Sequence, residues 1–324
     1  MFDELANRIK GRGIRLVFPE GQDARVLGAA VRLHADGLVK PILIGDEAEI
    51  LAIAKQKNWV VQDIEIIHPD HFEQMPDMID AFVERRKGKN TREQAVKLLQ
   101  DPVYFGTMLV YQGLADGMVC GAVYATSDTV RPALQIIKTR PGVKLISGAF
   151  IMVPPHNNGQ KLVFADCAIN INPDAASLAE IAVESAKTAR IFGIEPKVAM
   201  LSFSSHGSAF APEVDKVAEA TALVREMDPD LAVDGELQFD AAYVPEVARQ
   251  KVPDSKVAGQ ATVFVFPEIQ SGNIGYKIAQ RLGNFQAVGP ILQGLNKPVS
   301  DLSRGCVEED VYKVAIITAN QALN

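Results

Sequence analysis

The sequence has few of the residues that mark a disulfide-bonded or metal-binding protein. Its three cysteines, Cys120, Cys167 and Cys306, lie far apart and form no C-x-x-C pair. Dispersed thiols of this kind are typical of a reducing compartment, so we expect a cytoplasmic protein without disulfides or a zinc site. No histidine belongs to an H-E-x-x-H motif or to a similar ligand pair. We therefore expect no metal.

Long apolar runs and an excess of positive charge are also absent. No apolar run approaches the roughly 20 residues of a membrane-spanning helix. The first residues, MFDELANRIKGRG, indicate a short amphipathic helix and not a signal peptide. The formal net charge of -7 argues against nucleic acid or an anionic membrane surface as the main partner. A small anionic ligand is compatible with this charge, because arginines can cluster locally in an acidic protein.

Short β-branched runs alternate with longer helical patterns along the chain, which is typical of an α/β protein with mainly parallel sheets. Several runs are apolar almost throughout, as expected for strands that helices cover on both faces. We expect strands at 14–18, 40–45, 64–67, 117–122, 143–153, 161–166, 197–203, 261–266 and 285–291. We expect helices at 24–36, 47–57, 73–87, 91–100, 125–138, 175–192, 211–226, 239–250, 273–283 and 307–322.

The length of 324 residues favours two domains. Boundary signals occur at 139–142, between a helix and a long strand, and near 293–298. We therefore expect a discontinuous first α/β domain, residues 1–141 plus 296–324, and a second α/β domain, residues 142–295. The chain would cross between the domains twice, and we expect the ligand to bind in the cleft between them.

The stretch PVSDLSRGCVEEDVYK, residues 298–313, places Ser303 and Arg304 ahead of an acid-rich helix start. Asp310 precedes Val314 by four residues, so we expect it on the buried side of the helix, facing the loop. A solvated capping acid and a local turn hydroxyl would explain Asp310 and Ser303 equally well. Arg304 favours a site, because a guanidinium can hold a phosphate or a developing oxyanion with two hydrogen bonds.

Other stretches also contain groups that suit an anion. In SGNIGYKIAQRLG, Gly272 and Gly275 would expose backbone N–H groups at a helix start, although neither nucleotide-binding fingerprint is present. Arg281 in this stretch is, on its own, an ordinary surface residue. In YATSDTVRPALQII, capping explains Ser127 and Thr129. Capping does not explain Arg131, which in the first turn would oppose the helix dipole.

Three further features have ordinary alternatives. The loop LSFSSHGSA offers Ser204 and Ser208 for a phosphate nest, but it also suits a polar surface loop. The cluster FVERRKGKNTRE contains Arg85 at a helix C-terminus, where cations are favoured in any case. Cys167 could accept an acyl group, yet no histidine lies near it in sequence, and buried cysteines are usually inert.

The chain resembles bacterial phosphate acetyltransferases over almost its whole length. The resemblance rests on motifs that occur in order, among them FPEGQDARVL, FVERRKGK, YFGTMLVYQGLADGMV, DTVRPALQIIKT, FADCAINI, DGELQFDAA, GNIGYKIAQRLG, GPILQGLNKPV and DLSRGC. It implies reversible acetyl transfer between CoA and phosphate, with small-molecule substrates, no cofactor and a homodimer. It also implies two three-layer α/β domains of the isocitrate/isopropylmalate dehydrogenase-like kind.

The resemblance also implies roles for individual residues. Ser303 and Arg304 match the family's catalytic Ser-Arg pair, and Asp310 matches the acid proposed as the base for the CoA thiol. Arginines implicated in CoA binding or catalysis match Arg281, Arg131 and Arg85. We add Ser127, Thr129, Ser204, Ser208, Gly272 and Gly275 as further substrate contacts. The chain departs from the pattern at Ser205-His206, where Thr-Lys is expected, at Ser127, where alanine is usual, and in the loop 154–160, which does not align.

The chemistry fits these residues. A thiol with a pKa of about 8.5 is mostly protonated at neutral pH, so a carboxylate such as Asp310 could remove its proton during attack. Arg304 and Ser303 could stabilise the tetrahedral intermediate, and direct transfer in a ternary complex would need no covalent enzyme intermediate. Three alternatives are a phosphate butyryltransferase, a metal- and NAD-dependent dehydrogenase of the same fold, and a non-catalytic CoA- or phosphate-binding module.

Overall fold

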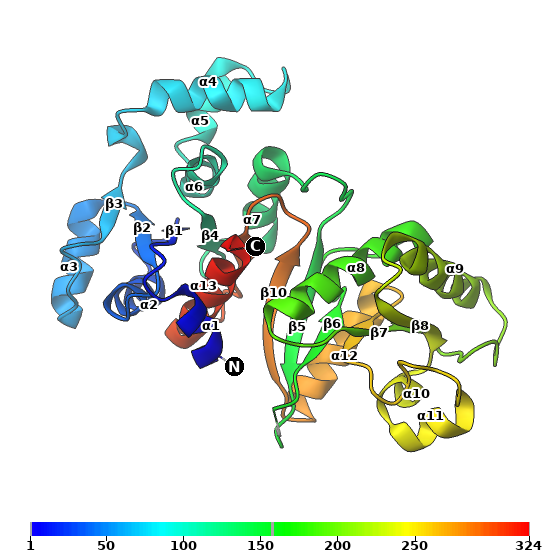
Figure 1. The fold of residues 1–324 in the computed structure, drawn as a ribbon. Helices are drawn as coiled ribbons and strands as arrows, with labels where there is room; N and C mark the ends of the chain where they lie inside the picture. Colours follow the sequence, from blue (N-terminus) through cyan, green and yellow to red (C-terminus); the bar gives the residue numbers. More distant parts are fainter. Residues whose placement is uncertain (1, 157–158, 324) are drawn as a thin grey trace. The chain divides into compact units, whose positions relative to one another are not determined.

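The computed structural model describes residues 2–156 and 159–323, so part of the unaligned loop 154–160 lies outside the described residues. The chain divides into two compact units (Figure 1). Unit 1 comprises Met1–Arg140 and Leu295–Asn324, and unit 2 comprises Pro141–Gly294. Each unit has its own sheet with helices packed on it, which confirms the predicted α/β class. In the ranges that the structure describes, no helix is long and apolar enough to cross a membrane.

Unit 1 contains a parallel five-stranded sheet in the order β11-β4-β1-β2-β3. Leu16, Val17 and Phe18 of β1 are fully buried, because helices cover both faces of the sheet. In Figure 1, α6 lies on one face and α2 and α13 lie on the other. The strands are β1 (Arg15–Phe18), β2 (Lys40–Ile44), β3 (Glu65–Ile67), β4 (Gly117–Cys120) and β11 (Val299–Asp301). The helices are α1 (Phe2–Ile9), α2 (Ala24–Ala35), α3 (Glu47–Lys57), α4 (Met75–Arg86), α5 (Arg92–Leu98), α6 (Pro102–Tyr111), α7 (Thr126–Pro132) and α13 (Glu308–Ala322), with a 3-10 turn at Pro69–His71 and a π-helical turn at Ala133–Ile137.

Neighbouring parallel strands bring three loops of unit 1 to one edge of its sheet. Strands β1, β4 and β11 lie side by side, and Asp301 at the end of β11 pairs with Cys120 at the end of β4. The loops that follow these strands are residues 19–23, 121–125 and 302–307. The carboxyl ends of the strands in such sheets are where ligands usually bind. The loop that contains Ser303 and Arg304 therefore lies among the loops at this edge.

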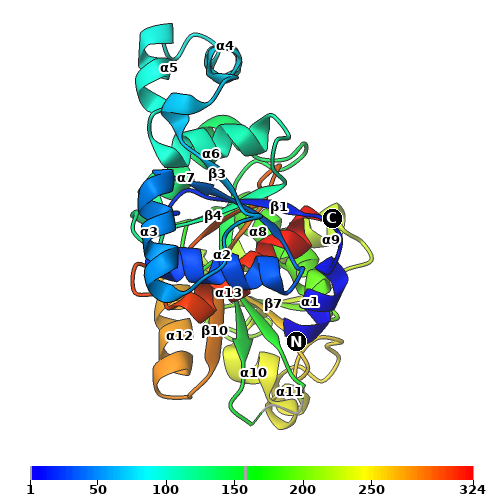
Figure 2. The same ribbon diagram turned by 90° about the vertical axis from the view of Figure 1, so that its left-hand side faces the viewer.

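Unit 2 contains a six-stranded mixed sheet in the order β10-β5-β6-β9-β7-β8. Strand β5 runs antiparallel to both of its neighbours, and the remaining pairs are parallel. Helices α8 and α9 lie on one face, and α10, α11 and α12 lie on the other (Figures 1 and 2). The strands are β5 (Ser147–Val153), β6 (Leu162–Ala165), β7 (Lys197–Leu201), β8 (Ala232–Leu237), β9 (Val263–Val265) and β10 (Gln286–Gln293). The helices are α8 (Ala175–Ile191), α9 (Pro212–Met227), α10 (Phe239–Tyr243), α11 (Pro245–Lys251) and α12 (Ile269–Arg281).

The structure corrects several element predictions. Strands β8 and β11 and helix α6 were not expected from the sequence. Strand β8 contains Asp, Gly and Glu, which are depleted in strands, and β11 has only 3 residues. Helix α6 is buried on most sides, so it lacks the amphipathic period that reveals a surface helix. The helix expected at 239–250 is two helices, α10 and α11, because Pro245 starts a new one.

Candidate functional site

The turn between β11 and α13 exposes both Ser303 and Arg304. The Ser303 carbonyl accepts a hydrogen bond from the Cys306 amide at 2.8 Å, which closes the turn. The Ser303 hydroxyl accepts one from the Gly305 amide at 3.3 Å. Its own proton therefore stays available to a ligand. No hydrogen bond or ion pair engages the Arg304 guanidinium within residues 2–156 and 159–323.

Asp310 lies in the first turn of α13 and points back toward this turn. Its Oδ2 accepts a hydrogen bond from the Val307 amide at 3.0 Å, an N–H that has no partner within the helix. Asp310 is exposed, and the buried stripe of α13 begins at Val311. The expectation that Asp310 lies on the buried side was wrong, because its carboxylate serves the helix start instead. The expectation that it faces the Ser303 loop agrees with this geometry.

The Arg25 guanidinium holds the Ser303–Cys306 turn in place. Its Nη1 donates to the carbonyls of Arg304 at 2.9 Å and Cys306 at 3.0 Å. Its Nη2 donates to the carbonyl of Ala122 at 2.8 Å and to Asp23 Oδ2 at 2.8 Å, and its Nε donates to Asp23 Oδ1 at 3.0 Å. Asp23 is the N-cap of α2. Burial favours a raised pKa for Asp23, but hydrogen bonds and charge from Arg25 outweigh it and lower the pKa.

The Glu20 carboxylate holds the neighbouring loop, which follows β4. Glu20 is only 7% exposed and accepts hydrogen bonds from four consecutive amides. These amides belong to residues 121–124, and the distances are between 2.7 and 3.1 Å. Four donors are enough to keep a buried carboxylate satisfied. Sequence reasoning missed Glu20 and Arg25, although two charged residues directly after an apolar strand, in FPEGQDAR, were an available signal.

A second buried carboxyl group lies two residues before Ser303. Asp301 is 2% exposed, and its Oδ1 has no hydrogen-bond partner among the described residues. Burial raises its pKa to about 6, although the hydroxyls of Thr126 and Thr129 lower it. A Cβ atom at Gly121 would lie 2.5 Å from Asp301 Oδ1, so only glycine fits beside this carboxyl group. Thr129 is fully buried, which is inconsistent with the substrate contact predicted for it.

Helix α7 places Arg131 differently from the prediction. The helix starts at Thr126, so Arg131 lies in its last turn, where a cation does not oppose the helix dipole. The dipole argument for an anionic ligand was therefore wrong. Arg131 is nevertheless exposed, and no ion pair or hydrogen bond engages its guanidinium in the part of the chain that the structure describes. Ser127 is also exposed, with its hydroxyl 3.4 Å from Asp128 Oδ1.

Arg85, at the end of α4, contacts the protein itself. Its Nε donates to the Ile136 carbonyl at 2.6 Å, and its Nη2 donates to the Ile137 carbonyl at 3.0 Å. Its guanidinium also lies 4.8 Å from the centre of the Tyr111 ring. Arg85 therefore caps the π-helical turn that continues α7. Nη1 is the terminal nitrogen of Arg85 that these hydrogen bonds leave for a ligand.

In unit 2, helix α12 begins at Ile269 and not at 273. Glu268 caps it by accepting hydrogen bonds from the amides of Gln270 and Ser271. The Gly272 amide donates to the Glu268 carbonyl, so it is not free for an anion. A Cβ at Gly272 would lie 2.3 Å from the Asp166 carbonyl oxygen. Gly272 thus permits close packing inside the helix, so its amide does not provide the exposed N–H group that was predicted for an anion.

Arg281 and the serine loop complete the predicted residues of unit 2. Arg281 lies in the last turn of α12 and is exposed. The loop after β7 already contains an anion of the protein, because Glu236 Oε1 accepts hydrogen bonds from the Ser204 hydroxyl at 2.9 Å and the Gly207 amide at 2.7 Å. The Ser208 hydroxyl accepts one from the Ser205 amide at 3.0 Å. The Glu236 carboxylate therefore occupies the nest that we expected for phosphate.

Comparison with known proteins identifies the family. Residues 1–319 match the family model described as phosphate acetyl/butaryl transferase. The phosphate acetyltransferase of Bacillus subtilis (strain 168) is 59% identical over 323 residues, which is 100% of this chain and 99% of that protein. A phosphotransacetylase structure from Streptococcus pyogenes matches with a TM-score of 0.97 and 60% identity, covering 99% of this chain and 98% of that one. The EutD phosphotransacetylase from Staphylococcus aureus has a TM-score of 0.93 and 54% identity, with the same coverage.

The chain belongs to this family. It is an acyltransferase, and its mixed α/β fold is the fold of the phosphotransacetylase structures. This membership argues against the dehydrogenase alternative, and a fold shared with dehydrogenases carries no function by itself. Within this family of acyltransferases, the exposed turn with Ser303 and Arg304 offers one hydroxyl donor, one guanidinium and, from α13, one carboxylate.

The thiol of Cys167 is not suited to accept an acyl group. Cys167 is fully buried, and burial followed by the charge of Asp166 raises its thiol pKa well above the usual value.

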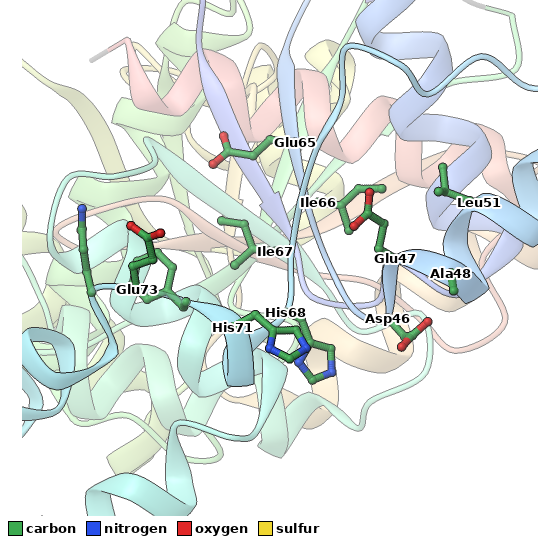
Figure 3. A pocket seen from close by; sticks show the side chains of 12 residues that line it. Asp46, Glu47, Ala48, Leu51, Glu65, Ile66, Ile67, His68, His71 and Glu73 are labelled. Carbon is green, nitrogen blue, oxygen red and sulfur yellow. The ribbon is translucent and has the colours of Figure 1, made fainter.

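An open pocket runs along β3, with acidic side chains and the rings of His68 and His71 at its rim (Figure 3). It contains none of the predicted site residues. Within residues 2–156 and 159–323, no group of three or more His, Cys, Asp or Glu side chains is arranged to hold a metal ion.

Proposed function

We propose that the protein reversibly transfers an acetyl group between CoA and inorganic phosphate. The observation that carries this proposal is the exposed Ser303-Arg304 turn, with the carboxylate of Asp310 bound to the helix start beside it. Full-length identity of 54 to 60% to proteins named phosphate acetyltransferase or phosphotransacetylase supports it. Arg131 and Arg281, both exposed, are the arginines that we propose for the phosphates of CoA.

The proposed reaction is direct transfer in a ternary complex. Asp310 accepts the proton of the CoA thiol as the sulfur attacks the carbonyl carbon of acetyl phosphate. The resulting tetrahedral intermediate carries negative charge on its oxygen atoms, which Arg304 and the Ser303 hydroxyl stabilise. The C–O bond then breaks, phosphate leaves with the bonding electrons, and the new C–S bond remains. This sequence uses neither a metal nor an acyl-enzyme, so we also propose that no cofactor is required.

The test is an assay of the purified protein with acetyl phosphate and CoA in the presence of EDTA, followed by thioester absorbance. We expect acetyl-CoA to form, and Ser303→Ala to slow its formation. A protein that binds CoA but produces no thioester would instead be a binding module. Faster turnover of butyryl phosphate than of acetyl phosphate would assign the longer acyl chain, and activity that returns only with added divalent metal would contradict the cofactor-free reaction.

We also propose that the protein is a cytoplasmic homodimer. Unit 2 exposes large apolar side chains, with Phe203 60% and Phe210 93% exposed. Large apolar side chains left exposed to solvent are one of the features that can mark a protein interface. Light scattering on a sizing column would test the oligomeric state, and a mass equal to the 35.1 kDa of one chain would contradict the homodimer.

A further inference from the structure

The guanidinium of Arg25 has no donor left for a substrate. An arginine side chain carries five N–H donors in a rigid fork. In this structure Nε donates to Asp23, Nη1 to the carbonyls of Arg304 and Cys306, and Nη2 to Asp23 and the carbonyl of Ala122. We propose that Arg25 is a positioning residue, which sets the position of the Ser303-Arg304 turn and contacts no substrate itself. This inference rests on the proposed roles of Ser303 and Arg304.

The contacts of Arg25 join three loops that meet at one edge of the sheet in unit 1. Asp23 fixes the fork at the start of α2, where it also accepts the Arg25 amide at 2.9 Å. From this anchor, Arg25 reaches the loop after β4 through Ala122 and the turn after β11 through Arg304 and Cys306. Glu20, from the same loop as Asp23, holds the loop after β4 by four amides. The segment Glu20–Arg25 therefore fixes the backbone on which Ser303 and Arg304 are carried.

The alternative is that Arg25 binds a phosphate of CoA, as other arginines are proposed to do. Its guanidinium would then have to release a carbonyl or Asp23 to bind the ligand. Arg25 donates two hydrogen bonds to the Asp23 carboxylate, and this ion pair raises the pKa of Arg25. Releasing Asp23 to bind a ligand is therefore costly. The two roles predict different kinetics. A positioning role lowers kcat, whereas a CoA-binding role raises KM for CoA.

The experiment compares Arg25→Ala and Arg25→Lys with Arg32→Ala. Arg32 is a matched control, because it also joins α2 to the α13 region, but through the Glu309 carboxylate and the Tyr312 ring instead of the turn's backbone. We expect both Arg25 variants to lose roughly a hundredfold in kcat, as small misplacements of catalytic groups do. We expect little change in KM for CoA, normal kcat in Arg32→Ala, and partial recovery of Arg25→Ala by added guanidinium ion.

Two further measurements separate the outcomes. Hydrogen exchange of the amides in segment 303–310 should be faster in Arg25→Ala than in Arg32→Ala. Normal exchange together with normal kcat would overturn the inference. It would also be overturned if KM for CoA rose and the variant no longer distinguished CoA from dephospho-CoA. If Ser303→Ala and Arg304→Ala kept full activity, the proposed catalytic roles of these two residues would fail, while the exchange data would still report on the contacts of Arg25.

Discussion

We expect the buried carboxyl group of Asp301 to make unit 1 less stable as the pH rises. Burial raises the pKa of this carboxyl group from its usual 3.8 to about 6 in the folded protein. Between these values the folded state holds a proton that the unfolded state has released. The contribution of Asp301 to stability is therefore fully present below about pH 4 and is lost as the pH rises through 6. A difference of about 2 pKa units corresponds to about 3 kcal/mol.

The assay compares urea unfolding of the wild-type protein and Asp301→Asn from pH 4 to pH 8. The chain has a single tryptophan, Trp59, which belongs to unit 1 and reports its unfolding. Other carboxyl groups titrate in both proteins, so the difference between the two isolates Asp301. Between pH 4 and pH 8, we expect the free energy of unfolding of Asp301→Asn to rise by about 3 kcal/mol relative to that of the wild-type protein. The control is Asp63→Asn, because Asp63 is exposed. If the difference in free energy of unfolding between the wild-type protein and Asp301→Asn stayed constant with pH, the reasoning would be refuted.

Two further predictions concern the reaction. Asp310→Asn should lose most of kcat, while Cys167→Ala should keep a substantial fraction of it, because Cys167 is buried and its pKa is raised. When both substrates are varied, the initial velocities of the wild-type protein should give intersecting double-reciprocal lines. Parallel lines, with labelled acetyl recovered on Cys167, would instead show an acyl-enzyme. Arg131→Ala and Arg281→Ala should raise KM for CoA or lower kcat/KM, because both guanidinium groups are exposed. Unchanged kinetics toward CoA in both variants would remove them from the site.

Local pattern predicted the elements with a clear apolar period or run, and missed the elements that lack one. Strand β1 is apolar and buried on both faces, so its sequence alone indicates it. Strand β11 is visible only through its pairing with β4, from Val299 opposite Met118 to Asp301 opposite Cys120. Boundary errors had larger consequences. The expected start of α12 was four residues too late, so Gly272 was placed at the start of the helix, whereas the structure has it inside the helix.

The site shows the same division between local and long-range information. Ser303, Arg304 and Asp310 lie within eight residues, so one stretch of sequence could indicate all three. Arg25 contacts Arg304 and Cys306 across 279 and 281 positions in the chain, and Glu20 contacts the amides of 121–124 across 101 to 104 positions. No local period records such contacts, because they arise only when parallel strands bring their loops together.

The most direct test of the central claim is the steady-state activity of Arg304→Ala and Ser303→Ala with acetyl phosphate and CoA, measured beside their urea unfolding. Both side chains are exposed, so their removal should leave the free energy of unfolding nearly unchanged. The loss of one preorganised donor to the tetrahedral intermediate should lower kcat by about a hundredfold to a thousandfold. Near-normal kcat combined with reduced stability would contradict the account, because it would show that the turn serves only to begin α13.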